Sequence, residues 1–179
     1  MTYQDILTFW FQEITPKDWW VKSDELDQKI KKRFLIIHQA AIADELCEWR
    51  HCPEGRLAEI IILDQFSRNI FRNQAEAFES DSIALALAQE AIFNRCDQDL
   101  PSAQRAFLYM PFMHSESPFV HLQAERLFLQ EGMEGNHEAE LRHKAIIDRF
   151  GRYPHRNIIL GRRSTPEEEE FLQLPGSSF

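Results

Sequence analysis

The stretch DQFSRN, residues 64–69, places charged and amide side chains on an otherwise apolar segment. Asp64 and Arg68 are four residues apart, as are Gln65 and Asn69, so each pair shares one face of a helix. Buried polar groups need hydrogen-bond partners, because leaving them unpaired costs several kcal/mol. Such pairs either brace neighbouring helices or line a polar cavity. In a cavity, Arg68 and Asn69 would bind a ligand and Asp64 would orient the arginine.

The stretch PFMHSESP, residues 111–118, also brings together side chains suited to chemistry. Each of its two prolines disfavours a helical conformation at the residue before it. His114 and Glu116 are therefore expected on one side of a short extended link. An imidazole and a carboxylate in this arrangement suit acid–base catalysis or metal binding. The alternative is a connector whose serine and glutamate cap the next helix.

The stretch RFGRYPHRN, residues 149–157, concentrates three arginines and a histidine on a restricted backbone. Gly151 suits the left-handed residue that ends a helix, and Pro154 fixes its own φ angle. The resulting link would project the side chains of His155, Arg156 and Asn157. In the alternative interpretation, Asn157 caps the next segment and Arg156 pairs with a carboxylate elsewhere.

Charge is unevenly distributed along the chain. The formal net charge of −9 over 179 residues argues against nucleic acid and anionic membranes as partners. Residues 142–163 nevertheless carry seven arginines and lysines against one acid, Asp148. A local basic patch in an acidic chain suits a small anion. His143 is expected to point inward, whereas Arg162 and Arg163 are expected at the solvated surface.

Several other site classes find little support in the sequence. No close pair such as HxxxH or ExxH indicates a metal site, so no metal ligand is assigned. Three cysteines without a CxxC spacing predict neither a disulfide framework nor a thiolate zinc site. The N-terminus does not resemble a signal peptide, and no run approaches the ~20 apolar residues of a membrane span. We therefore expect a soluble, cytoplasmic protein with no membrane partner.

Helical periodicity dominates the chain, and no segment shows a convincing strand pattern. The predicted fold class is all-α, in a single domain over 1–179 whose tail, 174–179, is flexible. Short connections favour helical hairpins packed as a bundle or as a tetratricopeptide-like right-handed superhelix, with no sheet. The expected helices are residues 2–13, 24–50, 56–72, 81–95, 101–111, 119–132, 137–150 and 164–172.

Local signals set several helix ends. Ser23 is the expected N-cap of the second helix, and Pro53 and Gly55 predict the turn that follows this helix. Near the C-terminus, Thr165 and Glu168 are placed to form a capping box around a proline at the first helical position.

Several segments together resemble an uncharacterised bacterial family, the domain of unknown function number nine hundred and twenty-four. The resemblance rests on FWF at 9–11, LAEIIILDQFSRNIFR at 57–72, AFESDSIALALA at 77–88, FLYMPFMHSE at 107–116 and FGRYPHRNIILGRRSTPEEEEFL at 150–172. It covers nearly the whole chain and implies an all-helical fold akin to tetratricopeptide repeats, but no established activity. It also favours one polar centre built from DQFSRN, HSE and YPHRN.

The leading hypothesis is a pocket for a small ligand that carries a phosphate or a carboxylate. Arg68 and Arg156 would bind this anion as bidentate forks, and Asn69 and Asn157 would fix its orientation. The residues available for proton transfer, if the protein is an enzyme, are His114, Glu116 and His155. The full expected ligand-binding set is Asp64, Arg68, Asn69, His143, Arg156 and Asn157.

Two rival functions use the same residues differently. A tetratricopeptide-like module would bind a peptide segment, and the motif residues would then be internal struts. A metal-dependent hydrolase is the third hypothesis. Struts should pair wholly with each other in the interior, whereas a ligand pocket should be open and hold spare donors.

Overall fold

The computed structural model describes residues 1–178, and its regular elements are all helical. No strand occurs in these residues, so the predicted all-α class without a sheet is confirmed. The α-helices are α1 (Tyr3–Thr8), α2 (Asp24–Ile42), α3 (Pro53–Ile61), α4 (Ser67–Ile70), α5 (Glu76–Glu79), α6 (Asp81–Phe93), α7 (Ser102–Met113), α8 (Pro118–Leu127), α9 (Glu134–Phe150) and α10 (Pro166–Phe171). Across the described residues, no helix combines the length and the apolar character needed to cross a bilayer.

Helix α2 begins where the sequence predicts and ends earlier. The Ser23 side chain accepts a hydrogen bond from the Leu26 backbone N–H at 3.3 Å, which makes Ser23 the N-cap. The predicted end at Arg50 was wrong, because the α-helix stops at Ile42. Asp44 takes a φ of 60°, and a left-handed residue cannot continue a right-handed helix.

Pro53 and Gly55 were expected to form the turn between two helices, but they belong to the first turn of α3. Pro53 is the first helical residue, where its missing N–H costs nothing. Gly55 permits a close approach of two segments, because a Cβ at this position would lie 2.0 Å from the carbonyl oxygen of Trp49. The predicted turn was therefore wrong, and these residues instead bring the preceding 3₁₀ turn against α3.

From α3 to α4 the chain is one nearly continuous helix, widened by a π-helical turn at Ile62–Phe66. Its side chains are buried almost all round, as its apolar composition predicts. Beyond the wide turn, the Ser67 hydroxyl donates to the Leu63 carbonyl at 2.6 Å and lies 2.7 Å from His38 Nε2. These bonds tie the widened helix to α2.

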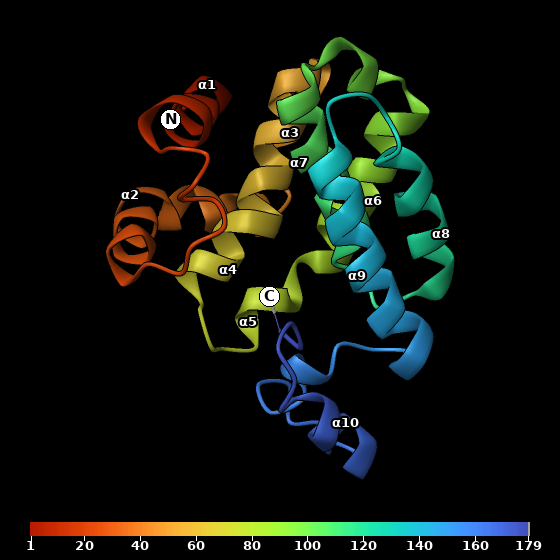
Figure 1. Ribbon diagram of the computed structural model, residues 1–179. Helices are drawn as coiled ribbons and strands as arrows, with labels where there is room; N and C mark the ends of the chain where they lie inside the picture. The colour runs from red at the N-terminus through yellow and green to blue at the C-terminus, as the bar shows by residue number, and fades with distance from the viewer. Residues whose placement is uncertain (179) are drawn as a thin grey trace.

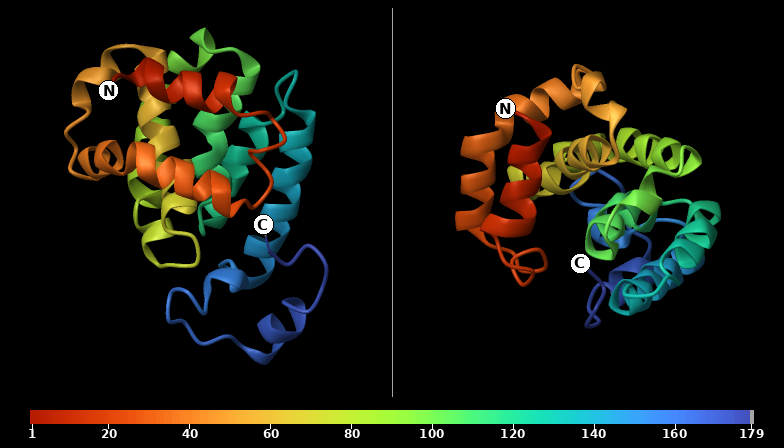
Figure 2. Two further views of the ribbon diagram at one scale, coloured as in Figure 1. Left: turned by 90° about the vertical axis from the view of Figure 1, so that its left-hand side faces the viewer. Right: turned by 90° about the horizontal axis from the view of Figure 1, so that it is seen from above.

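Helix α3 occupies the centre of the molecule. Helix α1 packs on one side of it and α6 and α7 on the other, and the packing then continues from α7 to α8 and from α8 to α9. Seen from above, these helices follow an arc, and the C-terminal end of the chain returns toward its open side (Figure 2, right). The large core between them is rich in aromatic rings, among them Phe9, Trp10, Phe34 and Phe66.

The C-terminal segment after α9 lies below the helices in Figure 1. Gly151, with a φ of 68°, ends α9 as predicted. The predicted capping box of α10 is present: the Glu168 N–H donates to the Thr165 hydroxyl at 3.2 Å, and the Thr165 N–H donates to the Glu168 carboxylate at 2.7 Å. In the tail, the Ser177 hydroxyl donates to the Leu172 carbonyl at 3.2 Å. The flexibility of the tail stays a prediction, and its last residue lies outside the described chain.

Candidate functional site

A cavity of about 810 Å³ lies where α4, the end of α7, the middle of α9 and the segment after Gly151 come together. All three sequence motifs contribute to its lining. DQFSRN provides Gln65, Arg68 and Asn69; HSE provides His114; YPHRN provides Tyr153, His155 and Arg156. His143 on α9 lines it as well. This volume falls within the range of ordinary small-molecule sites.

Arg68 contacts carboxylates of the protein itself. Its two terminal nitrogens donate to the two oxygens of Asp81, at 2.9 and 3.1 Å. The expected pair with Asp64 is also formed, at 3.1 Å. Burial lowers the pKa of Arg68, but both carboxylates act in the opposite direction and the pKa is raised overall. The bidentate contact expected with a ligand is therefore made to Asp81, at the start of α6.

His114 is held by Asp64. Its Nδ1 lies 2.7 Å from Asp64 Oδ1, and Gln65 donates to the other carboxylate oxygen at 2.5 Å. Burial raises the pKa of Asp64, but Arg68 and His114 outweigh burial and hold this pKa well below its usual range. Burial and the charge of Arg68 lower the pKa of His114. The pair is therefore a carboxylate beside a neutral imidazole at neutral pH.

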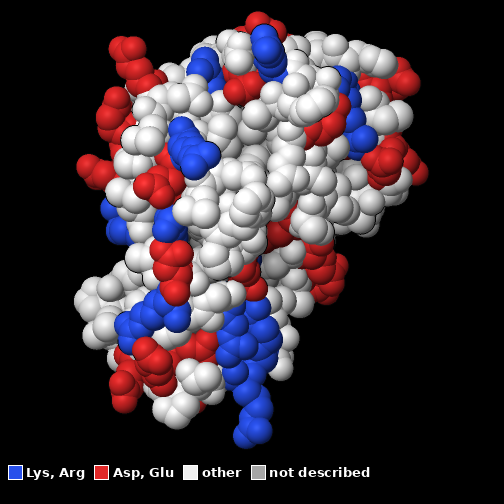
Figure 3. Space-filling view, turned by 90° about the vertical axis from the view of Figure 1, so that its right-hand side faces the viewer, with Lys and Arg blue, Asp and Glu red and all other residues white. Residues whose placement is uncertain are grey.

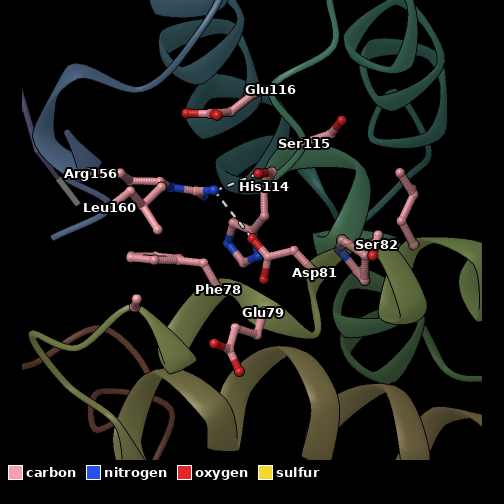
Figure 4. Close-up of a pocket in the computed structure, with 12 residues that line it drawn as sticks. Phe78, Glu79, Asp81, Ser82, His114, Ser115, Glu116, Arg156 and Leu160 are labelled. Carbon is pink, nitrogen blue, oxygen red and sulfur yellow. Dashed lines mark hydrogen bonds and ion pairs between the residues drawn. The ribbon is translucent and has the colours of Figure 1, made fainter. Parts of the chain in front are cut away.

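Arg156 is enclosed by the protein and only 6% exposed. Its guanidinium carbon lies 4.6 Å from the ring centres of both Phe78 and Tyr153. It donates to Asp81 at 3.2 Å and to the His114 carbonyl at 3.0 Å, as the dashed lines of Figure 4 show. Its Nε is buried and has no hydrogen-bond partner within residues 1–178. Burial, and then the charge of Arg68, lower the pKa of Arg156.

Asn69 and Arg72 share one buried carboxylate, that of Asp27 on α2. Asn69 donates to Asp27 at 2.8 Å, and the Arg72 guanidinium binds both oxygens of the same carboxylate, one of them at 2.7 Å. The amide pair expected between Gln65 and Asn69 is replaced by these bonds. Arg72 lies only four residues beyond Arg68 and lines the cavity, but its role was not inferred from the sequence.

Glu116 and Asn157 lie apart from the larger cavity. Glu116 accepts a fork from Arg162, at 2.6 and 2.9 Å, and a bond from the Tyr153 backbone N–H at 2.7 Å. Burial raises the pKa of Glu116, but the bond from Arg162 and the backbone N–H lower it overall. Asn157 is fully buried and bonded to Arg162, Ser164 and Glu168. The expected surface role of Arg162 was therefore wrong, because this arginine ties Glu116 to Asn157.

Of the two remaining histidines of the motif set, His143 is buried and His155 is half-buried, and both are electrically neutral at pH 7. Burial lowers the pKa of His155 to about 4, assisted by the charge of Arg156. Burial also lowers the pKa of His143 to about 3. His143 Nδ1 lies 2.8 Å from the carbonyl oxygen of Ala139, one turn earlier on α9, so this nitrogen carries the proton. His143 points inward, as the helical periodicity predicts.

A smaller cavity of about 450 Å³ lies on the other side of Arg156. Phe78, His114 and Arg156 line both cavities and form the wall between them. The smaller cavity also contains Asp81 and Glu116, so its side of the wall is more acidic (Figure 4). Within residues 1–178, no group of three or more histidine, cysteine and acidic side chains is placed to hold a metal ion.

The rim of the larger cavity contains residues that sequence reasoning missed. Lys22 and Arg142 line it, are exposed, and form no ion pair within the described chain. Among residues 1–178, Asp18 provides the one carboxylate of the lining. Arg142 belongs to the basic run that the sequence revealed, but only the packing of α9 shows which of those cations reach a cavity. Other lysines and arginines gather with acidic residues on the lower part of the face in Figure 3.

These features define an all-helical protein with a cavity, rich in cationic side chains, where its three polar motifs meet. The chain belongs to a family of bacterial proteins of unknown function, DUF924, whose model matches residues 6–176. It is similar to a solved structure, a protein of unknown function (ATU0120) from Agrobacterium tumefaciens, with 37% identity, a TM-score of 0.91 and 96% of each chain covered. No curated protein matches the chain significantly. The likeness to tetratricopeptide repeats stays a prediction.

Proposed function

We propose that the larger cavity binds a small molecule that carries a phosphate or a carboxylate. In the part of the chain that the structure describes, five cationic side chains line this cavity against one carboxylate, in a protein whose net charge is −9. They are Lys22, Arg68, Arg72, Arg142 and Arg156. The carboxylates of Asp27, Asp64 and Asp81 bind the arginines and neutralise part of this charge. The cations therefore differ in whether they are free to contact a ligand directly.

The proposal rests mainly on Arg156, because the protein compensates its positive charge only in part. Arg68 and Arg156 share the single carboxylate of Asp81, and Arg68 already uses both of its oxygens. Arg156 is 6% exposed and keeps a buried N–H without a partner. A buried donor left unpaired costs about 1–3 kcal/mol, and more when it is charged. An anion in the cavity would offset part of the positive charge of Arg156.

The cations that form no ion pair within the protein would contact the anion directly. Arg142 and Lys22 lie at the rim and are free to turn toward a ligand. An arginine fork can bind a phosphate or a carboxylate through two parallel hydrogen bonds. Arg68 and Arg156, held in place by Asp81, would supply fixed positive charge at the bottom of the site.

The Asp64–His114 pair gives the site a capacity for proton transfer. Asp64 accepts a hydrogen bond from the Nδ1–H group of His114. The other ring nitrogen of His114 is therefore left as a hydrogen-bond acceptor. A carboxylate-oriented neutral imidazole is a common general base. His114 is therefore the residue that we would assign to acid–base chemistry if the bound molecule reacts. His155 remains a second candidate, whereas Glu116 is committed to Arg162.

The bonds made by the motif residues also favour a rival function, the helical interaction module. Arg68, Asn69 and Arg156 all pair with protein groups, as struts would. In that case the cavity has no small ligand and the protein acts through a peptide partner. The third hypothesis, a metal-dependent hydrolase, has no supporting cluster of ligands in the described residues.

Thermal unfolding with methyl phosphate and with acetate tests the proposal. A ligand at a hundred times its Kd stabilises the folded state by about 2.7 kcal/mol, which raises the Tm of a chain this size by roughly 5–10 °C. We expect such a shift for wild type, and an affinity about tenfold weaker in Arg142→Gln. The matched control is Arg126→Gln, an exposed arginine on α8 that lines neither cavity. No shift with either anion, together with equal behaviour of both variants, would favour the interaction module.

A further inference from the structure

Three tryptophans line the same cavity as the arginines. Trp10, Trp19 and Trp20 come from the N-terminal part of the chain, whereas most of the cations come from α4, α9 and the segment after it. The cavity therefore has an aromatic wall in addition to its cationic side chains. This aromatic wall, defined as these three residues, is not explained by the binding of an anion alone.

The inner part of the aromatic wall is rigid. Trp10 is 1% exposed and its ring stacks on that of Trp19, with an angle of 19° between the planes. The Trp19 indole N–H donates to the Trp10 carbonyl at 2.9 Å, which fixes the ring orientation. The indole nitrogen of Trp10 is buried and has no hydrogen-bond partner in residues 1–178. One donor in the aromatic wall is thus unused.

The outer part of the aromatic wall is open to solvent. Trp20 is 61% exposed, although tryptophan is one of the largest apolar side chains. Its ring lies nearly parallel to that of Phe107, at 12°, with 6.1 Å between ring centres. Trp20 is therefore in offset contact with Phe107, and most of its ring surface stays accessible. Ligand sites are typically apolar and aromatic, with a few placed polar groups that fix orientation.

We propose that the ligand of this cavity is an aromatic phosphate or carboxylate, whose flat ring stacks on Trp20 while its anionic group meets Arg142 and Lys22. This inference rests on the proposed function and adds the chemical class of the ligand. Stacking on an aromatic side chain strengthens the binding of flat rings, and any planar aromatic ring has the required face. The arginines select the charge and Trp20 selects the ring.

Matched pairs of probes separate the ring from the charge. Isothermal titration would compare phenyl phosphate with methyl phosphate, and benzoate with acetate, on wild type and on Trp20→Ala, Trp20→Phe and Phe93→Ala. Phe93 is an exposed aromatic residue, 87% accessible, that lines neither cavity. Because Trp20 is itself largely exposed, its replacement should leave the protein folded.

We expect the wild type to bind each ringed probe about tenfold more tightly than its ringless partner. Trp20→Ala should abolish this difference and leave methyl phosphate and acetate binding unchanged, whereas Trp20→Phe and Phe93→Ala should preserve it. If the ringed and ringless probes bind equally to wild type, or if Trp20→Ala keeps the preference, the ligand class is wrong but the anion site stands. If none of the four probes binds, both proposals fail.

Discussion

His114 Nδ1 lies 2.7 Å from Asp64 Oδ1, so one hydrogen bond joins the C-terminal cap of α7 to the π-helical turn between α3 and α4. The same carboxylate is 3.1 Å from Arg68. Asp64 is only 1% exposed and carries its charge because these two partners compensate for burial. The bond therefore both fixes the proton on Nδ1 of His114 and connects two parts of the core.

Asp64→Asn should reduce stability strongly. The amide removes the charge that compensates Arg68 in the interior, and breaking one partner of a buried ion pair costs about 3–5 kcal/mol. Since Asp81 still binds Arg68, we expect a loss at the lower end, about 3 kcal/mol, in urea unfolding. The NMR-monitored pKa of His114 should also fall further, because the Asp64 carboxylate is one of the groups that raise it.

The control for this variant is Asp148→Asn. Asp148 forms an i,i+4 pair with Lys144 at 2.6 Å, but its side chain is 49% exposed. Exposed pairs of this kind contribute about 0–1 kcal/mol. Equal, small losses in the two variants would show that Asp64 does not bear a buried charge in the folded protein.

His38 should make the protein less stable in mild acid. Burial lowers its pKa from 6.5 to about 4, and its Nε2 lies 2.7 Å from the Ser67 hydroxyl. Because the folded pKa is below the unfolded one, the unfolded chain binds more protons between these values, and stability rises with pH over this window. From pH 7 to pH 4.5 this one group should remove about 2 kcal/mol from the free energy of unfolding.

Urea unfolding of wild type and His38→Gln at pH 7 and pH 4.5 measures this contribution. Glutamine keeps a donor for Ser67 but does not titrate, so the variant should lose about 2 kcal/mol less than wild type on acidification. His143 and His155 have pKa values lowered in the same direction and will act equally in both proteins. An identical pH dependence of the two proteins would mean that His38 is already protonated, or exposed, in the folded state.

Glu116→Gln should weaken the fold without affecting the ligand. Glu116 binds Arg162 and the Tyr153 N–H, and it does not line the larger cavity. Its pKa is lowered, so its contribution is present above the ordinary value of 4.5 and is lost as the pH falls through the folded value. We expect a loss of about 1 kcal/mol at pH 7, since the pair is partly exposed, and unchanged methyl phosphate binding. A large loss of binding with stability intact would restore Glu116 as a functional residue.

The sequence predicted those features that depend on neighbouring residues. The capping box of Thr165, the N-cap of Ser23 and the inward direction of His143 follow from short-range geometry, and each is present. The i,i+4 pair of Asp64 and Arg68 survives even on the π-helical turn. All of these signals are contained within one helix or its ends.

The sequence could not predict which distant groups compensate each charge. Asp81 binds both Arg68 and Arg156, and the second of these lies 75 residues away along the chain. A carboxylate at the start of α6 resembles an ordinary helix-terminus acid in the sequence. The rim residues Trp20 and Arg142 were missed for the same reason, because tertiary packing decides which of many surface residues face a cavity.

Glu168→Gln should loosen the whole segment after α9. Glu168 is 2% exposed and accepts hydrogen bonds from Arg152 at 2.7 and 2.8 Å, from the Thr165 N–H, and from Asn157. These bonds, led by those from Arg152, lower its pKa to about 2, so its stabilising effect is complete at neutral pH and disappears as the pH falls below 4.5 toward 2. The amide loses the ion pair and weakens the cap, at a cost of about 2 kcal/mol.

Hydrogen exchange measures this loosening directly. We expect faster exchange over residues 151–172 in Glu168→Gln, with α3 and α7 unchanged, because the segment has its own small core around Tyr153. Glu169→Gln is the control, since Glu169 is adjacent, exposed and without a side-chain bond in the described chain. Because His155 and Arg156 reach the cavity from this segment, methyl phosphate binding should weaken together with the protection. Faster exchange with unchanged binding would mean that the anion contacts lie wholly on α4, α9 and the N-terminal rim.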